Sequence, residues 1–115
     1  MEIRQYQTPA GREPVREFLA ELPDGAKNEI FTLLRRLEAG ETLEMPHCRS
    51  LSSLAHGLYE LRVRDAAGQI RLFYYTKLRG IIYLLHALRK TTRIISKQER
   101  KLILRRLRYI ERSFR

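Results

Sequence analysis

The sequence has few of the residues that support covalent or metal-based chemistry. Cys48 is the only cysteine, so the chain cannot form an internal disulfide, and we expect this residue to be packed rather than reactive. The three histidines and Cys48 show no spacing typical of metal ligands. The sequence therefore predicts neither a metal site nor a cofactor.

Long apolar stretches are also missing. No run approaches the roughly 18 apolar residues of a membrane-spanning helix. Residues 1–6 lack the apolar stretch of a signal peptide, and the chain contains no internal repeat or low-complexity segment. We therefore expect no membrane partner, a cytoplasmic location and a single domain over residues 1–115.

Positive charge is concentrated in the second half of the chain. Residues 58–115 contain 16 Lys or Arg and 4 Asp or Glu, whereas residues 1–57 contain 7 and 9. The formal net charge of +10 therefore arises in the second half. Such a field attracts a polyanion, and nucleic acid is the commonest polyanion in a cell.

The first half predicts one strand and two helices. Residues 3–7 are typical of a short strand, and Pro14 suits the first turn of a helix. A second helix is predicted after a break at residues 23–25, with Asp24 as its N-cap and Gly40 at its end. Because the break is short, we expect an antiparallel helical hairpin. The apolar positions recur on one face of each helix: Val15, Phe18, Leu19 and Leu22, then Ile30, Leu33, Leu34 and Leu37.

The second half predicts three strands. Residues 59–64 alternate between apolar and polar side chains, residues 70–76 continue after a hairpin turn at 65–68, and residues 81–87 are almost entirely apolar. Residues 41–57 have no clear period and are interpreted as a loop with at most one irregular strand or turn.

The last element is predicted to be a basic helix. Ser96 and Glu99 have the spacing of a capping box, which marks the start of a helix. The expected fold is α+β in the order β-α-α-β-β-β-α. We expect a curved antiparallel sheet of about four strands with the N-terminal helical hairpin on one face. The opposite face should then be partly open.

Three arginines are predicted to share that open face. Arg62 and Arg64 lie two residues apart on one strand, and Arg71 has the matching parity on the next strand. Arginine suits phosphate because its planar guanidinium donates two hydrogen bonds at once and stays charged. The three side chains therefore indicate a phosphate site, with a solvated basic face as the alternative.

His86 and Lys90 lie at the end of the apolar strand. Because the pKa of histidine lies near neutrality, His86 is a candidate for proton transfer. We expect the neighbouring cations, Arg89 and Lys90, to lower the pKa of His86. The alternative is a core histidine with one satisfied hydrogen bond. Arg89 and Arg93 are further candidates for substrate binding.

Aromatic and acidic residues complete the candidate surface. Tyr74 and Tyr75 are adjacent, so they should face opposite sides of the sheet, and either one is a candidate for stacking on a base. Sheet packing is the alternative for both. Glu60 shares the face of Arg62, and we favour an ion-pair partner over a general base. The last helix carries a basic stripe interpreted as an RNA-binding or a solvated face: Lys101, Arg105, Arg108 and Arg112.

Several short segments together resemble the RelE/ParE superfamily of type II toxins. Within it, the chain is most similar to the HigB-like, phage-derived group. The matching segments are residues 46–51, with proline first and leucine last, and residues 57–62, Gly-Leu-Tyr-Glu-Leu-Arg. Residues 69–74, 84–91 and 96–108 follow in the family's order and spacing. Arg62, Arg71, His86 and Lys90 fall on its motif positions, and Tyr74 is a weaker match.

The resemblance implies a growth-inhibiting endoribonuclease that cuts mRNA, usually in the ribosomal A site. It implies Arg62 and Arg71 at the scissile phosphate, His86 in proton transfer and Lys90 in charge neutralisation. Arg64 joins the two arginines on strand parity and on a loose similarity to the basic strand of RelE-type toxins. The substrate 2′-hydroxyl would be the nucleophile, without a metal ion. It also implies a cognate helix-turn-helix antitoxin, HigA-like in type, and assembly of toxin and antitoxin into a heterotetramer as in many such systems.

Two other interpretations stay open at this point. The other branch of the superfamily inhibits DNA gyrase, and this activity would need no RNA chemistry. A non-enzymatic basic module that binds nucleic acid would explain the charge, but it leaves the convergence of Arg, His and Tyr on one sheet unexplained.

Overall fold

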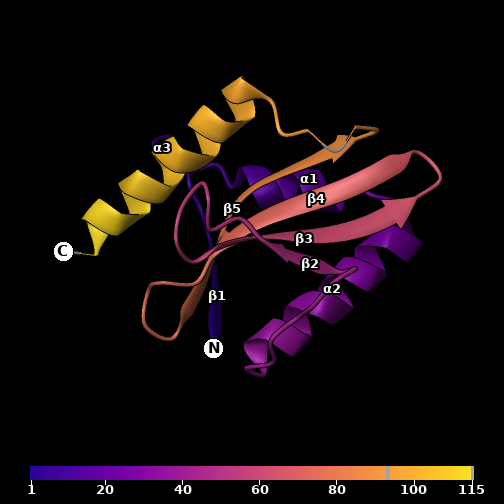
Figure 1. Cartoon of the computed structure of the whole chain (residues 1–115), viewed down its shortest axis with the longest axis horizontal. Helices are drawn as coiled ribbons and strands as arrows, with labels where there is room; N and C mark the ends of the chain where they lie inside the picture. The colour runs from indigo at the N-terminus through magenta and orange to yellow at the C-terminus, as the bar shows by residue number, and fades with distance from the viewer. Residues whose placement is uncertain (93, 115) are drawn as a thin grey trace.

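The computed structural model describes residues 1–92 and 94–114, which form one mixed sheet and three helices (Figure 1). The α+β class and the predicted order of the main elements are confirmed. The elements along the chain are β1 (Glu2–Gln5), α1 (Pro14–Ala20), α2 (Asp24–Glu38), β2 (Cys48–Ser50), β3 (Leu58–Asp65), β4 (Gly68–Tyr75), β5 (Ile81–Lys90) and α3 (Lys97–Ser113).

The sheet has five strands in the order β1-β5-β4-β3-β2, one more than expected. β2 lies in the segment that was interpreted mainly as a loop, and its three residues are too few to show a period. β1 pairs with β5 in parallel, whereas the other pairs are antiparallel. The purely antiparallel sheet was therefore wrong in detail, because a strand that returns through helices is free to pair in parallel.

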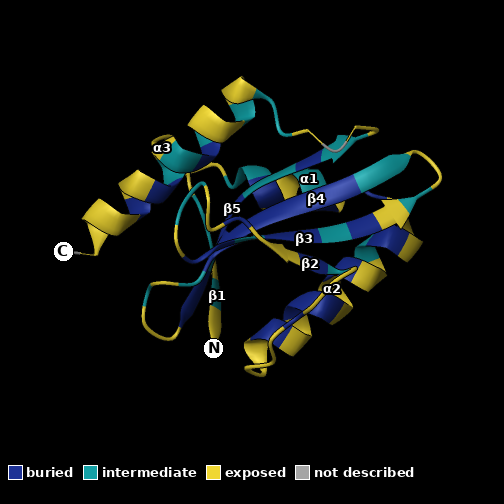
Figure 2. Cartoon of the chain, in the orientation of Figure 1, coloured by how far each residue is buried: buried dark blue, intermediate teal, exposed yellow. Residues whose placement is uncertain are grey.

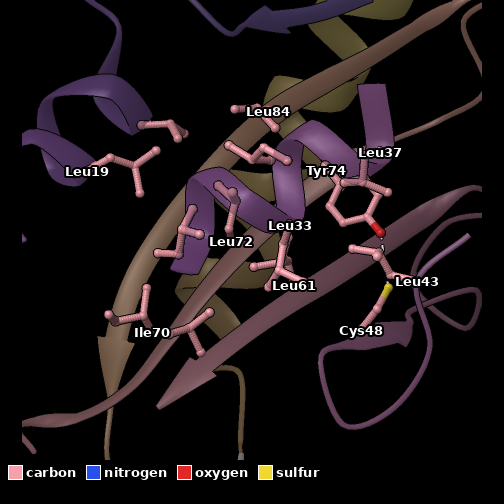
Figure 3. Close-up of a cluster of buried hydrophobic side chains, with 14 of the residues drawn as sticks. Leu19, Leu33, Leu37, Leu43, Cys48, Leu61, Ile70, Leu72, Tyr74 and Leu84 are labelled. Carbon is pink, nitrogen blue, oxygen red and sulfur yellow. Dashed lines mark hydrogen bonds between the residues drawn. The ribbon is translucent and has the colours of Figure 1, made fainter. Parts of the chain in front are cut away.

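Helices cover both faces of the sheet. α1 and α2 pack on one face, where their apolar side chains meet those of β3, β4 and β5 in a single core. Figure 2 shows the buried side of both helices turned toward the sheet. Figure 3 shows this core in detail, where Leu33 and Leu37 of α2 gather with Leu61 and Leu72 of the strands.

α3 packs on the opposite face and closes a second core. Ile103, Leu107 and Ile110 are buried there against Phe73 and Leu85. The face that we expected to be partly open is therefore covered over part of its area by α3. The uncovered part lies toward the β3–β4 turn, away from α3 in Figure 1.

Most local signals were interpreted correctly. The Ser96 hydroxyl accepts a hydrogen bond from the Glu99 backbone N–H at 3.1 Å, and the Glu99 carboxylate accepts one from the Ser96 N–H at 3.2 Å, which confirms the capping box. Gly40 follows α2 with a φ of 89°, a conformation that glycine adopts without strain. Asp24 was wrong as an N-cap. Pro23 holds that position, and Asp24 is the first helical residue with no capping hydrogen bond.

The turn at residues 65–68 is confirmed as the β3–β4 hairpin, with Asp65 opposite Gly68. Gly68 has a φ of 132°, and a Cβ atom there would lie 3.1 Å from the Lys90 carbonyl oxygen. β5 continues to Lys90, three residues beyond the predicted end of this strand. No helix in the described part of the chain is both long and apolar enough to cross a membrane.

Replacement of Ser96 by alanine should lower the free energy of unfolding by about 1 kcal/mol, because an N-terminal amide of α3 loses its acceptor. Urea denaturation followed by circular dichroism measures this change. Ser52→Ala is the control, because Ser52 is exposed and caps no helix. Equal stability of the two variants would show that the cap contributes nothing.

Candidate functional site

The candidate site lies at the end of the sheet that α3 leaves uncovered. Arg62 on β3 lies opposite Arg71 on β4, and Arg64 lies opposite Gln69. Gln69 in turn lies opposite Lys90 on β5. Because alternate residues of a strand share a face, these five side chains project from the same side of the sheet.

Two hollows meet at this cluster. One has a volume of about 420 Å³ and is lined by the β3–β4 turn, Lys90 and residues 91–92. The other, of about 600 Å³, lies toward β2 and is lined by Glu29 and residues of the 45–49 segment. Arg62, Arg64 and Gln69 border both hollows, and they therefore form the ridge between them.

A buried carboxylate joins two of the arginines. The Glu60 Oε1 atom lies 3.1 Å from Arg62 Nε, and its Oε2 atom lies 3.7 Å from Arg71 Nη1. Glu60 and Arg71 are each only 1% exposed. Glu60 is thus an ion-pair partner of the two arginines, which is the role that we favoured over that of a general base. Burial raises its pKa, and the charges of Arg71 and Arg62 oppose that rise.

Arg71 is occupied by contacts within the protein. Its Nε donates to Gln69 Oε1 at 3.2 Å, and its Nη2 donates to the Thr92 carbonyl oxygen at 2.7 Å. The same Gln69 oxygen accepts a hydrogen bond from Arg62 Nη2 at 3.2 Å. Arg71 therefore lies beneath the surface and holds β3, β4 and the segment after β5 together. This placement differs from the exposed phosphate contact that the sequence suggested.

Arg62, Arg64 and Lys90 are surface cations of the site, and the exposed Arg49 also lines the larger hollow. The side chain of Arg62 is 13% exposed, whereas Arg64 is exposed at the rim. Lys90 Nζ lies 2.7 Å from a Glu99 carboxylate oxygen, so α3 holds it beside the smaller hollow. An anion with several oxygens, such as a phosphate, fits guanidinium and ammonium donors arranged around a hollow.

Other predicted site residues lie elsewhere. Arg89 projects to the α1–α2 side, level with Ile70, and pairs with Asp65. It is therefore not brought together with Arg62 and Arg71. Arg93 lies outside the described residues.

His86 lies on the same face as Arg62, but under α3. Its ring stacks on Phe73 with the ring centres 6.0 Å apart, and Arg106 of α3 approaches its Nδ1 atom to 3.4 Å. Because guanidinium is only a donor, Nδ1 must accept and Nε2 carries the proton of the neutral ring. His86 lines neither of the two hollows. In this arrangement it is separated from the surface cations.

The expected cause of the His86 pKa shift was wrong, although the direction was right. The pKa falls to about 4, first because the ring is buried and then because Arg106 is positively charged. Arg89 and Lys90, the cations that we expected to act, are directed to Asp65 and Glu99. The sequence could not indicate Arg106, which lies twenty positions farther along the chain.

Both tyrosines are buried, on opposite faces of the sheet. The Tyr74 hydroxyl lies 3.0 Å from Cys48 Sγ in the core under α2, and burial raises its pKa. Tyr75 lies under α3, donates to a Glu111 carboxylate oxygen at 2.9 Å, and has its pKa raised to about 12, mainly by burial. Neither ring offers a free face for a base, because both residues are almost fully buried and the Tyr74 ring is stacked on the Tyr59 ring.

Sequence reasoning missed two residues. Gln69 shares the parity of Arg71, and this signal was available because it precedes that arginine by two residues. Arg106 lies three residues after Ile103 on the inner side of α3, donates to the Leu85 carbonyl at 2.8 Å and packs over the Tyr6 ring. No group of three His, Cys, Asp or Glu side chains in the described part of the chain is arranged to hold a metal ion.

Replacement of Glu60 by glutamine should lower the free energy of unfolding by about 3 kcal/mol or more, because Arg71 would stay buried without its counterion. Urea denaturation measures the loss. In the double variant Glu60→Gln/Arg71→Met the buried charge is removed as well, so the two losses should not add. Additive losses would show that the two side chains are not coupled.

Replacement of Arg106 by methionine should raise the His86 pKa above about 4, because the ring loses a positive neighbour. Histidine NMR resonances followed against pH measure this change, with Lys101→Met as the control for an exposed charge on the same helix. In the native protein the folded pKa lies below the unfolded value of about 6.5. Protonation of His86 therefore opposes folding. The stability that the protein has while the His86 ring is neutral decreases as the pH falls from about 6.5 to 4. An unchanged pKa in Arg106→Met would show that burial alone sets it.

Comparison with known proteins gives one family. No curated protein matches the sequence. The family described as phage derived protein Gp49-like (DUF891) matches residues 17–108, which include β2 to β5, most of α3 and the whole ridge between the two hollows. The chain therefore belongs to the phage-derived Gp49-like family, a family of RelE-type, toxin-like proteins.

Proposed function

We propose that this protein is the toxin of a type II toxin–antitoxin system and that it cuts mRNA on the ribosome. The proposal places it in the cytoplasm, where cleavage of translated mRNA arrests growth. The toxin-like family supports the first part. The observation that carries the second part is the ridge of Arg62, Arg64 and Gln69 between two hollows, with Lys90 beside it.

The proposed reaction uses the substrate as its own nucleophile. The 2′-hydroxyl gives up its proton to a base as its oxygen attacks the adjacent phosphorus, the bond from phosphorus to the 5′-oxygen breaks, and the leaving oxygen takes up a proton from an acid. The products are a 2′,3′-cyclic phosphate, or the 3′-phosphate after hydrolysis, and a 5′-hydroxyl. Arg62, Arg64 and Lys90 would stabilise the charge that develops on the phosphorane oxygens.

In this proposal Arg71 is a positioning residue. It acts through Gln69 and Glu60, which fix the Arg62 guanidinium at the edge of the hollow. The proposed proton donor or acceptor is His86, which the resemblance places in this role. Its Nδ1 faces Arg106 and its half-buried ring packs against α3, so the ring is only partly open to a substrate.

The partners in this proposal are mRNA, the ribosome and a HigA-like helix-turn-helix antitoxin. The hollows are open, and they hold a substrate at few points. A ribosome would supply the geometry of the mRNA that such a site does not impose by itself. An antitoxin with acidic side chains would complement the charge of +10.

Primer extension on an mRNA translated in vitro tests the proposal, with the same RNA free of ribosomes beside it. We expect cuts at a fixed codon position on ribosomes only. Arg64→Gln should slow cleavage by about a hundredfold, because a donor to the phosphate is removed. Since Arg64 is exposed, this variant should keep the native stability. His86→Gln should abolish cleavage.

Arg79→Gln is the matched control, because Arg79 is exposed in the β4–β5 turn and its loss changes the net charge equally. An mRNA that stays intact under both conditions would contradict the proposal. DNA supercoiling by gyrase would then be measured, since inhibition there identifies the other branch of the superfamily. Cleavage that Arg64→Gln and Arg79→Gln slow equally would place the chemistry elsewhere on the protein.

A further inference from the structure

The outer face of α3 carries positive charge only. Its cations follow a spacing of four, four, three and four residues, which keeps them within one narrow sector of a helix with 3.6 residues per turn. They are all exposed: Lys97, Lys101, Arg105, Arg108 and Arg112. The row from first to last is about 22 Å long, from a rise of 1.5 Å per residue.

The acidic residues of α3 do not neutralise this row. Glu99 is turned to Ser96 and Lys90 at the start of the helix, and Glu111 accepts the hydrogen bond from Tyr75. Within the described part of the chain, no ion pair joins any cation of the row to a carboxylate. The row therefore faces solvent with its full charge.

Such a row opposes the stability of the helix. Like charges four residues apart repel each other, and three pairs of the row have this spacing. The helix is held in place by its buried residues, Ile103, Leu107 and Ile110, on the opposite side. This packing fixes the direction of the cations. Because no carboxylate of the described chain pairs with them, an external anion would lower their mutual repulsion.

We propose that the outer face of α3 is a docking surface for the phosphate backbone of a folded RNA. The choice of RNA rests on the proposed function, whereas the surface itself does not. A continuous row of cations matches a continuous row of phosphates. A membrane surface fits less well, because an interfacial helix inserts an apolar side and that of α3 is buried in the core.

This surface is distinct from the candidate cleavage site. The cations of the row line neither of the two hollows beside Arg62 and Arg64. The row lies on the side of α3 that faces away from the sheet. RNA bound there would hold the protein near its substrate and would make no contact with the scissile phosphate.

Fluorescence anisotropy with a 2′-O-methyl RNA hairpin tests the proposal. This probe lacks the 2′-hydroxyl nucleophile, so binding is measured whether or not the protein cleaves RNA. The variant Arg105→Gln/Arg108→Gln is compared with Arg35→Gln/Arg79→Gln, which removes the same charge from exposed positions elsewhere. Far-UV circular dichroism confirms that α3 stays helical. Vesicles of phosphatidylserine and phosphatidylcholine form a second arm.

We expect the α3 variant to bind the hairpin more weakly than the control variant at every salt concentration. Each phosphate contact contributes about 0.9 to the slope of log affinity against log salt, so the slope should fall by about 1.8. When the salt concentration is raised from 50 to 200 mM, the affinity of the α3 variant should therefore fall by a factor about ten times smaller than that of the control variant. Arg105→Lys/Arg108→Lys should retain binding, because the charge remains.

Equal binding by the α3 variant and the control variant would overturn the proposal, because the general field of the protein would then explain the affinity. A difference between them on vesicles and not on RNA would also overturn it. An α3 variant that binds the hairpin weakly but still cuts ribosome-bound mRNA would support docking and leave the cleavage proposal intact.

Discussion

The buried cluster of Glu60, Arg62 and Arg71 is the interaction on which the rest of the site depends. Two of its members are almost fully buried, and an isolated charge at such a depth would be strongly unfavourable. Each charge is tolerated because the others are present. Through Arg71 the cluster also binds the Thr92 carbonyl, so it fixes the point where the chain leaves β5 for α3. The shape of the smaller hollow follows from this connection.

The sequence predicts the elements well because their periods are strong, but it does not predict which strands pair. The alternation in residues 59–64 identifies β3, and Ser96 with Glu99 marks the start of α3. The parallel pairing of β1 with β5 depends on the path of the chain through α1 and α2, which no local pattern encodes. β2 has three residues and no recognisable period. The expected count of about four strands is therefore one short, and the purely antiparallel pairing is the part that was wrong.

Strand parity predicts which arginines share a face of the sheet, but it does not predict how deeply each one is buried. Parity brings Arg62 and Arg71 together correctly, since they are opposite each other across β3 and β4. Parity does not tell which of them is covered. That depends on α3, whose packing buries Tyr75 and partly covers His86, and on Thr92, whose carbonyl oxygen accepts a hydrogen bond from Arg71. Accessibility is a tertiary property, so the division between positioning and surface cations required the structure.

α3 combines three different faces on one helix. One face is apolar and fills the second core, and the outer face carries the row of cations. Arg106 lies on the inner side, where it holds the His86 ring through Nδ1 and stacks over Tyr6. The same packing that presents cations to the outside therefore partly covers His86 and lowers its pKa. In the two proposals, the helix that docks on RNA is therefore also the helix that packs against the proposed proton-transfer residue.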